Sequence, residues 1–524
     1  MSFRFLIQTF GCQMNVHDSD RMGAVLRAAG GVAVLAPENA DLVVFNTCSV
    51  REKAEQKLRS EVGKLAPLKR ARPDLVVAVA GCVAQQEGEA LLERNRHIDL
   101  VIGPDNVHEL PALLLEQMAG APPLARTVFD TENPRFLPWV PLEEPARSPG
   151  TAPARQSPVA AFVTTMKGCD ERCSFCVVPY TRGPERYRPA REIIDEVRRL
   201  VEAGSREVVL LGQTVDSYRD PELCSAGDAS VVPSAEAEES QFADLLHAID
   251  AQIPGYDPAR PARPGLARLR YTSPHPRHAS AKLARAHAEL DVLARHVHLP
   301  VQSGSDRMLR RMIRRYTRAD YVARADRLRR ARTGLTLSTD IIVGFPGETE
   351  EDFAETLSLV REIGFVSLFG FKYSPRPHTP ALRLGDDVPE AVKSERLARL
   401  FEVSEGFFSA HLASLVGTRQ SVLVESASKS EKGDTSLGRV QGRTERNEIV
   451  HVDVQNAANA AAVIGQIVDV EISRANRHSL AGLPVGPLPP PATAFYERPK
   501  PDPRESVHAR ESEGLGTRRL PLVS

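Results

Sequence analysis

Three cysteines stand close together in a glycine-led loop. Cys169, Cys173 and Cys176 have C-x3-C-x2-C spacing and follow the apolar run 161–166 through Gly168. A structural zinc site has four ligands, and iron–sulfur clusters are usually bound by four cysteine thiolates. Three thiols are therefore one ligand short of a closed site, so a metal or cluster held here would keep one position open.

This loop resembles the cluster-binding loop of the radical S-adenosylmethionine (SAM) enzymes. In that superfamily, three cysteines at this spacing hold a 4Fe-4S cluster, and SAM chelates the fourth iron through its amino and carboxylate groups. Phe175, the aromatic residue before the last cysteine, fits the same pattern. Two other interpretations are a zinc loop that borrows a distant ligand and three unrelated buried cysteines, since free cysteine is often buried.

The whole chain has the composition of an ordinary globular protein. Its 524 residues allow about three to five domains, and 42% of them are hydrophobic. The formal net charge of -1 gives no overall attraction to nucleic acid, so RNA contacts must come from local basic patches. We expect no signal peptide and no membrane-spanning segment, and hence a cytoplasmic protein that does not bind membranes.

A second set of cysteines follows three separate apolar runs. Cys12, Cys48 and Cys82 each end such a run, and helix-like stretches at 19–29 and 51–65 separate the runs. These are the repeated strand–helix units of a parallel sheet, in which ligands bind beyond the carboxyl ends of the strands. Small residues are common at such turns, but three cysteines in register favour a site, again an iron–sulfur cluster with an open iron.

Other uses of these residues are less consistent with the sequence. Gly11 and Gly81 are lone glycines without a Walker or GxGxxG pattern, so no phosphate-binding loop is expected at the same sheet edge. Six of the seven cysteines belong to the two sets of three, which fits metal ligation in a reducing compartment better than a disulfide framework. The remaining cysteine, Cys224, receives no role.

The residues around the N-terminal cysteines resemble the N-terminal domain of the radical-SAM methylthiotransferases. The matching strings are 9–15, 46–55 and 81–85, and the second of them resembles the MiaB branch, which acts on tRNA. The resemblance implies that Cys12, Cys48 and Cys82 hold a second, auxiliary 4Fe-4S cluster. It also implies that Asn15 and residues 49–52 line the pocket beside that cluster.

Strands and helices alternate between residues 161 and 374. Six strand–helix units predict a partial (β/α)6 barrel with the cysteine loop after its first strand, at the carboxyl face where barrels place their chemistry. One connection, 220–265, is long, polar and proline-rich except for a helix near 242–253, and we expect a surface insertion that contains Cys224. The strand candidates are 161–166, 207–211, 269–272, 296–301, 338–343 and 366–373.

Several strand ends in this segment also match the methylthiotransferase pattern. Glycines there permit close approach of the backbone to a ligand, and the resemblance implies a SAM pocket with Gln213, Gln302 and Ser303 as polar contacts near Phe175. Plain turn chemistry is the alternative. The string 213–216 reads QTVD where QNVN is more usual, and a proline enters the string at 271–276, so polar contacts there are altered. The matching strings are 177–183, 210–213 and 339–348.

Two further stretches are basic. Arg307, Arg310, Arg311, Arg314, Arg315 and Arg318 recur at helical spacing and predict one basic helix face, either solvated or in contact with phosphate. Short alternating strands from 417 to 485 predict a small β-barrel that resembles the RNA-binding TRAM domain. Under that resemblance, six residues of this barrel would face the RNA backbone; the alternative is that the arginines are lone surface residues. The six are Arg439, Arg443, Arg446, Arg474, Asn476 and Arg477.

We therefore expect an α/β chain of three domains. The ranges are a parallel-sheet methylthiotransferase domain at 1–140, a linker at 141–158, a radical-SAM barrel at 159–385 with the insertion 220–265, connecting helices at 386–416, a TRAM barrel at 417–485, and a disordered tail at 486–524.

The resemblance implies a tRNA methylthiotransferase that converts N6-isopentenyladenosine next to the anticodon into its 2-methylthio derivative. It would use two 4Fe-4S clusters and SAM, with catalytic Cys169, Cys173 and Cys176, the anticodon loop as partner, and an electron donor such as a flavodoxin or ferredoxin. We expect a monomer. The alternatives are a branch that modifies threonylcarbamoyladenosine tRNA or a ribosomal-protein aspartate, and a redox-sensing iron–sulfur RNA-binding protein that does not consume SAM.

Overall fold

The computed structural model describes residues 3–49, 52–132, 134–140, 157–224, 240–261, 263–428 and 438–488. The contacts divide the chain into two compact units. The first contains Met1–Arg155 and Tyr180–Arg182, and the second contains Gln156–Pro179 and Gly183–Phe495. Within the described ranges, no helix has the length and apolar character needed to cross a membrane. Most of the predicted linker and tail, namely 141–156 and 489–524, lies outside these ranges, as do residues 225–239 and 262 of the predicted insertion.

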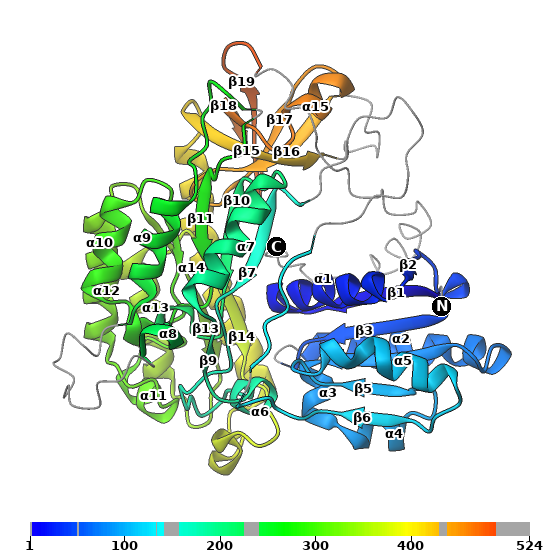
Figure 1. Cartoon of the computed structure of the whole chain (residues 1–524). Helices are drawn as coiled ribbons and strands as arrows, with labels where there is room; N and C mark the ends of the chain where they lie inside the picture. The colour runs from blue at the N-terminus through cyan, green and yellow to red at the C-terminus, as the bar shows by residue number, and fades with distance from the viewer. Residues whose placement is uncertain are drawn as a thin grey trace. The chain divides into compact units, whose positions relative to one another are not determined.

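The first unit is built on a six-stranded parallel sheet in the order β2-β1-β3-β4-β5-β6 (Figure 1). The predicted strands are present, and the three-residue strands β2 and β6 are added at its edges. The strands are β1 Phe3–Phe10, β2 Gly31–Ala33, β3 Leu42–Thr47, β4 Val76–Gly81, β5 Leu100–Ile102 and β6 Leu124–Arg126. The helices are α1 Gln13–Ala28, α2 Glu52–Ala71, α3 Cys82–Glu87, α4 Glu89–Arg94 and α5 Leu110–Met118, with 3-10 turns η1 Pro37–Asn39 and η2 Val107–Glu109.

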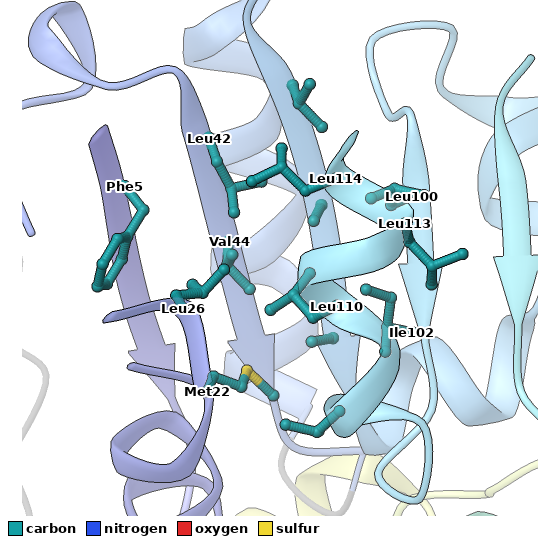
Figure 2. Packing of buried hydrophobic residues seen from close by; sticks show 14 of the residues in the cluster. Phe5, Met22, Leu26, Leu42, Val44, Leu100, Ile102, Leu110, Leu113 and Leu114 are labelled. Carbon is teal, nitrogen blue, oxygen red and sulfur yellow. The ribbon is translucent and has the colours of Figure 1, made fainter. Parts of the chain in front are cut away.

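Helices cover both faces of this sheet because β3 and β4 are apolar at successive positions. Every residue of β3 and β4 is buried, as expected for parallel strands between two layers of helices. Alternate residues point to opposite faces: Leu42 and Val44 pack under α1 and α5, whereas Val43 and Phe45 pack under α2. Figure 2 shows the first of these two cores.

The packing of α5 gives a direct test of this core. Leu110 is fully buried among α1 and the strands, so Leu110→Ala is expected to lower the stability of the sheet by about 2–5 kcal/mol through lost contacts and a residual cavity. Leu115 lies on the outer side of the same helix and is 47% exposed, so Leu115→Ala is expected to change it by less than about 0.5 kcal/mol. Hydrogen exchange of peptides from α5 and β5 measures both, and equal effects would contradict the packing.

The second unit begins with a barrel-like set of six parallel strands. Two three-stranded sheets, β7-β10-β11 and β12-β13-β14, are joined through a parallel bridge between Leu269 and Leu293. This confirms the six predicted strand–helix units. The strands are β7 Ala160–Thr164, β10 Glu207–Leu211, β11 Arg268–Tyr271, β12 His296–His298, β13 Thr336–Val343 and β14 Ser367–Lys372, with a small ribbon of β8 Met166–Lys167 and β9 Arg186–Tyr187.

The helices that follow these strands use amphipathic faces and side-chain caps. In α7 (Ala190–Glu202), the buried apolar residues recur at helical spacing from Ile193 to Val201. Thr317 and Thr349 close capping boxes at the starts of α12 and α13. The remaining elements are α6 Val178–Arg182, α8 Pro221–Cys224, α9 Phe242–Gln252, α10 Ala281–Glu289, α11 Asp306–Arg311, α12 Arg318–Ala331, α13 Glu350–Ile363 and α14 Glu390–Ser414, with η3 Val215–Ser217, η4 Pro276–His278 and η5 Pro380–Leu384.

The prediction of one basic helix face between 307 and 318 is wrong. Helix α11 ends at Arg311, and a turn separates it from α12. Arg307 pairs with Asp352, Arg318 pairs with Glu362, and Arg314 is buried. These arginines therefore have separate surroundings, because the short helix breaks the spacing that a continuous helix would have kept.

The end of the second unit is a closed five-stranded barrel in the order β15-β16-β17-β19-β18. It contains the predicted strands and one more, β19, while the predicted connecting helices form the single helix α14. Arg443 is buried and pairs with Glu425 at 3.3 Å, so the prediction that Arg443 faces RNA is wrong. The elements are β15 Arg419–Ala427, β16 Arg439–Arg443, β17 Ile449–Asp453, α15 Ala457–Val463, β18 Ile467–Ala475 and β19 Leu480–Pro484.

This small barrel is tied to the amino end of β11. Arg268 donates to the carbonyl oxygens of Arg443 at 2.6 Å and Ser421 at 2.8 Å. Arg270 donates to Thr444 O at 2.9 Å and pairs with Glu207 at 3.0 Å. The cysteine loop follows the carboxyl ends of the strands, so the small barrel and the loop lie at opposite ends of the parallel strands.

Candidate functional site

The loop with Cys169, Cys173 and Cys176 follows β8, and a glycine sets its path. Gly168 has φ +80°, and a Cβ there would lie 1.8 Å from the carbonyl oxygen of Pro184, so no larger residue fits. The Cys169 amide donates to Gly183 O at 3.1 Å, and the Cys176 amide donates to Cys173 O at 3.1 Å. These bonds fix the path of the loop, in which Cys169 and Cys176 both lie near enough to Cys173 for its charge to raise their pKa.

The buried surroundings of this loop favour the protonated thiol form of its cysteines over the thiolate, as long as no metal is bound. Burial raises the pKa of Cys169 to about 12, against a hydrogen bond with Thr214. Burial also raises the pKa of Cys176, and the nearby Cys173 adds to that effect. Thiolates are the ligating form, so binding of a metal or cluster here would release protons.

The end of β10 places unpartnered polar atoms near the same loop. Thr214 Oγ1 lies 3.0 Å from Cys169 Sγ, which brings the residue after Gln213 to the thiols. Both side-chain polar atoms of Gln213, and Asp216 Oδ2, are buried and lack a hydrogen-bond partner among the described residues. Burial raises the pKa of Asp216 to about 7. Buried polar atoms are normally paired, so these atoms fit a polar ligand.

The other predicted cofactor contacts have different surroundings. Phe175 packs against the buried cluster of Met308 and Phe345. Gln302 has a left-handed backbone, φ +76°, which is unusual for a non-glycine residue and typical of functional sites. The Ser303 hydroxyl lies 3.2 Å from Thr356 Oγ1 and accepts from the Ser305 amide at 3.2 Å, so it fixes the turn after β12.

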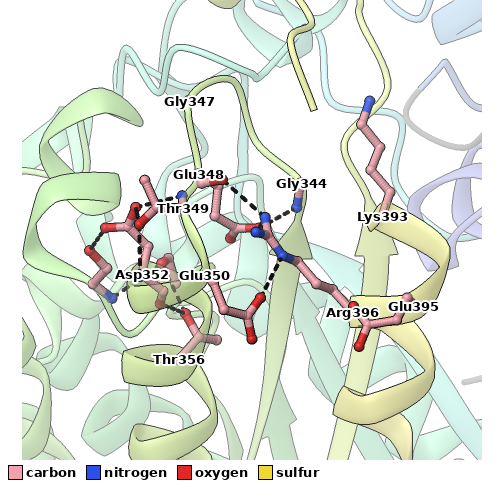
Figure 3. Close-up of polar contacts among 12 residues, drawn as sticks. Gly344, Gly347, Glu348, Thr349, Glu350, Asp352, Thr356, Lys393, Glu395 and Arg396 are labelled. Atoms are coloured by element: carbon pink, nitrogen blue, oxygen red, sulfur yellow. Dashed lines mark hydrogen bonds and ion pairs between the residues drawn. The ribbon is translucent and has the colours of Figure 1, made fainter. Parts of the chain in front are cut away.

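The turn after β13 is held by a buried ion pair (Figure 3). Glu348 accepts from the Gly344 amide at 2.6 Å and from Arg396 of α14 at 2.8 Å. Burial raises the pKa of Glu348 to about 7, although both donors oppose that shift. Gly344 and Gly347 have φ of +68° and +74°. The glycines of the string 339–348 thus serve a tight, buried turn at this strand end.

A group of Glu171, His275 and His278 lies within the second unit. Their ligand atoms are all within 4.8 Å of one another. However, Glu171 Oε1 already contacts His278 Nε2 at 2.9 Å and Arg277 at 3.3 Å. Two cationic partners disfavour an additional cation, so we interpret this group as an ion pair that anchors the cysteine loop to η4.

In the first unit, Cys12, Cys48 and Cys82 follow the adjacent strands β1, β3 and β4. Cys12 is the N-cap residue of α1, and Cys82 is the first residue of α3. A Cβ on Gly11 would lie 2.5 Å from Cys48 Cβ, and one on Gly81 would lie 2.3 Å from Asn46 Oδ1. Glycine therefore permits the close approach of the strand ends. The parallel register brings these three residues to one edge of the sheet.

The surroundings of this second set are polar and buried. Hydrogen bonding with Cys48 lowers the pKa of Cys12 to about 6, against burial. Asn15 accepts from the Cys12 thiol at 3.3 Å and donates to Asn46 at 3.1 Å. The Ser49 hydroxyl is buried without a hydrogen-bond partner in the described part of the chain. Residues 50 and 51 of the predicted pocket lie outside the described ranges, and the side chain of residue 52 is not described.

Arg182, which belongs to the first unit by its contacts, adds a positive charge to this set. Its Nε lies 3.2 Å from Cys82 Sγ, and Nη2 pairs with Asp18 at 2.7 Å. Burial raises the pKa of Cys82, and the charge of Arg182 opposes that shift. A buried guanidinium beside a thiol favours the thiolate that ligates a metal.

Sequence reasoning missed several residues that contact the thiols. Arg314 donates to Cys173 Sγ at 3.3 Å from 141 residues away, and Arg182 reaches Cys82 from 100 residues away. Thr214 was noticed only as a departure from the family string. Local spacing carries no signal for such contacts. Arg182 and Thr214 belong to glycine-containing strings, 177–183 and 210–216, which could have suggested them, whereas nothing of the kind marks Arg314.

Three family profiles match this chain: Uncharacterized protein family UPF0004 at residues 4–103, Radical SAM superfamily at 163–360, and TRAM domain at 413–485. Among solved structures, a radical S-adenosylmethionine methyltransferase, TsrM, from Kitasatospora setae is similar at a TM-score of 0.45 and 17% identity, covering 80% of this chain and 77% of that one.

Curated relatives are much more similar in sequence. The tRNA-2-methylthio-N(6)-dimethylallyladenosine synthase of Sorangium cellulosum is 62% identical over 479 residues, covering 91% of this chain and 92% of that protein. The synthase of the same name from Bordetella petrii is 43% identical, covering 91% of this chain and 90% of that protein. The chain therefore belongs to the family of the tRNA-2-methylthio-N(6)-dimethylallyladenosine synthases, which are radical-SAM methylthiotransferases.

Proposed function

We propose that this chain converts N6-isopentenyladenosine, also called N6-dimethylallyladenosine, next to the tRNA anticodon into its 2-methylthio derivative. The observation that carries the proposal is the 62% identity, over 91% of the chain, to a synthase named for this product. The two sets of three cysteines agree with it, because each set gathers thiols and leaves a cluster one ligand short.

The first cluster site is the loop of Cys169, Cys173 and Cys176. The radical-SAM superfamily uses SAM and a 4Fe-4S cluster, and three thiols in one turn fit that cluster with one iron left for SAM. When bound, SAM and the cluster supply the radical chemistry that activates an inert C–H bond. The chain supplies thiolate ligands and the bonds that fix the loop.

The strand ends next to the loop of Cys169, Cys173 and Cys176 would bind SAM. Gln213 offers a donor and an acceptor that the described residues leave unpaired, which fits the amino and carboxylate groups of SAM. Gln302 and Ser303 in the turn after β12, and Phe175 in the loop, are the further proposed contacts. Their task is to orient SAM and to exclude water from it.

The second cluster site is the sheet edge with Cys12, Cys48 and Cys82. The buried thiols, the unpaired Ser49 hydroxyl and the charge of Arg182 fit an anionic thiolate-bound group, so we propose an auxiliary 4Fe-4S cluster there. This cluster would supply the sulfur chemistry, and the cluster at Cys169, Cys173 and Cys176 would supply the radical chemistry. The chain's contribution is three ligands from three strands held in register.

The partner is tRNA, through its anticodon loop. Bases of a single-stranded loop can be splayed out for chemistry more easily than paired bases, and the TRAM profile match supports RNA binding by the small barrel. We further propose a cytoplasmic monomer that receives electrons from a donor such as a flavodoxin or ferredoxin.

The domain ranges are proposed as 1–140 for the methylthiotransferase domain, 159–385 for the radical-SAM domain and 417–485 for the TRAM domain. The profile matches at 4–103 and 163–360 lie within the first two ranges, and α14 occupies most of the connecting range 386–416. The TRAM match begins at 413, slightly before the proposed start.

Nucleoside analysis of tRNA tests this function. Deleting the gene is expected to remove 2-methylthio-N6-isopentenyladenosine and to leave N6-isopentenyladenosine, and expressing the chain is expected to restore the product. Reconstituted protein with an anticodon stem-loop bearing N6-isopentenyladenosine should form the product, whereas a matched stem-loop bearing threonylcarbamoyladenosine should not react. An unchanged product level after deletion, or reaction of only the second stem-loop, would contradict the proposed substrate.

A further inference from the structure

Arg314 is a buried cation at the cysteine loop. It is 4% exposed, and its Nη1 lies 3.3 Å from Cys173 Sγ. A buried charge carries a large desolvation cost, which is offset only where the charge is well paired and hydrogen-bonded. The partner of Nη1 is a thiol, and in the loaded protein this thiol would be a cluster ligand. The side chain therefore places a permanent positive charge next to the Cys173 sulfur, which would ligate the cluster.

The other nitrogens of the guanidinium fix its orientation. Nη2 donates to Pro300 O at 2.7 Å, and Nε donates to the hydroxyl of Tyr316 at 2.9 Å. The Tyr316 hydroxyl in turn donates to Val301 O at 2.9 Å. Pro300 and Val301 follow β12, so the barrel backbone holds the planar fork of donors in place and aims Nη1 at Cys173.

The backbone around Arg314 is strained in a way that serves this placement. Ile313 and Arg315, on either side, have φ of +57° and +56°. A β-branched residue such as isoleucine rarely adopts this left-handed conformation, and strained residues cluster at functional sites. In the same turn, Arg311 O and Met312 O accept hydrogen bonds from Ser174, at 2.8 and 3.0 Å. The turn thus holds both the cysteine loop and the guanidinium.

We propose that Arg314 raises the reduction potential of the cluster held by Cys169, Cys173 and Cys176, an inference that rests on the cluster assignment of the proposed function. Reduction of this site adds one electron, and hence one negative charge, with no proton. A fixed positive charge and an N–H donor at a ligand sulfur both stabilise that added charge. Thr214 makes a neutral contact with Cys169 at 3.0 Å, whereas Arg314 brings a full positive charge to Cys173 at 3.3 Å.

The test measures the midpoint potential in the full chain with Cys12, Cys48 and Cys82 all replaced by alanine, so that one cluster remains. Anaerobic titration with dithionite is followed by electron paramagnetic resonance. Arg314→Met and Arg314→Gln are each expected to weaken one-electron reduction at least about tenfold, which corresponds to a midpoint about 59 mV more negative. Arg314→Lys keeps the charge and is expected to stay within about threefold of the parent.

Arg310→Gln is the matched control, because it removes an arginine charge from an exposed position of the same segment and should leave the potential unchanged. Iron-loaded neutral variants with the parent potential would overturn the inference. The inference would also be overturned if every neutral variant lost the cluster while Arg314→Lys kept it at a midpoint potential well below that of the parent. Arg314 would then only hold the loop in place. If the parent with three alanines contains no iron, the cluster assignment itself is wrong.

Discussion

Cys173→Ala is expected to abolish SAM cleavage while about half of the reconstituted iron stays in the protein. Cys173 is buried in the loop that Gly168 and Ser174 hold in place, so its removal leaves two thiols for a cluster that needs three. SAM then has no open iron to bind. Deoxyadenosine formation under dithionite should fall at least about a hundredfold, because the cofactor carries the chemistry.

Cys224→Ala is the matched control, because Cys224 belongs to neither set of three cysteines. It is expected to leave both the iron content and deoxyadenosine formation at the parent level. Continued SAM cleavage by Cys173→Ala, or loss of all iron, would show that these thiols do not hold a separate cluster. Far-ultraviolet circular dichroism checks that the variant keeps its secondary structure.

Replacing Cys12, Cys48 and Cys82 together by alanine is expected to remove the other half of the iron, about four atoms per chain, while SAM cleavage continues. These three thiols follow the ends of β1, β3 and β4, in a different unit from the loop of Cys169, Cys173 and Cys176. Product formation on an anticodon stem-loop should nevertheless stop, because the proposed sulfur chemistry depends on them. Iron and sulfide analysis, with a deoxyadenosine assay, measures both effects.

A conservative control separates loss of the ligands from loss of the fold. Asn15→Ala removes a neighbour that accepts from the Cys12 thiol and bonds Asn46, and it is expected to weaken iron binding about 10–100-fold without abolishing it, as for other outer contacts of metal ligands. Unchanged iron in the triple alanine variant would mean that these thiols are structural. The sulfur-insertion part of the proposed function would then be wrong.

Much of the fold follows from local patterns. The apolar runs before Cys12, Cys48 and Cys82 predict β1, β3 and β4, and the runs of β3 and β4 are continuous because both faces of these strands are buried. The parallel-sheet rule then brings three cysteines to one edge, as the structure confirms by register. The six barrel units are predicted in the same way. Strands β2 and β6 are short edge strands that are partly exposed, so they lack the apolar run that indicates a buried strand.

Charged residues were predicted less well, because their surroundings come from distant parts of the chain. Helical spacing predicted a shared face for Arg307 and Arg314, but α11 ends between them at Arg311. Likewise, Arg443 in a strand of the small barrel reads as a surface residue, whereas Glu425 and the barrel wall bury it. Spacing records only which residues share a local face, not whether another element covers that face.

The sequence by itself determined where six cysteines stand in two sets of three, because residue type and spacing are local properties that do not depend on packing. The two sets of cysteines and the order of strands and helices belong to this part. Only the tertiary structure decided the electrostatics around the thiols. Arg314 contacts Cys173, which is 141 residues away in the sequence, and His278 contacts Glu171, which is 107 residues away. These contacts form because the carboxyl ends of strands that are far apart in the sequence lie together at one end of a parallel barrel.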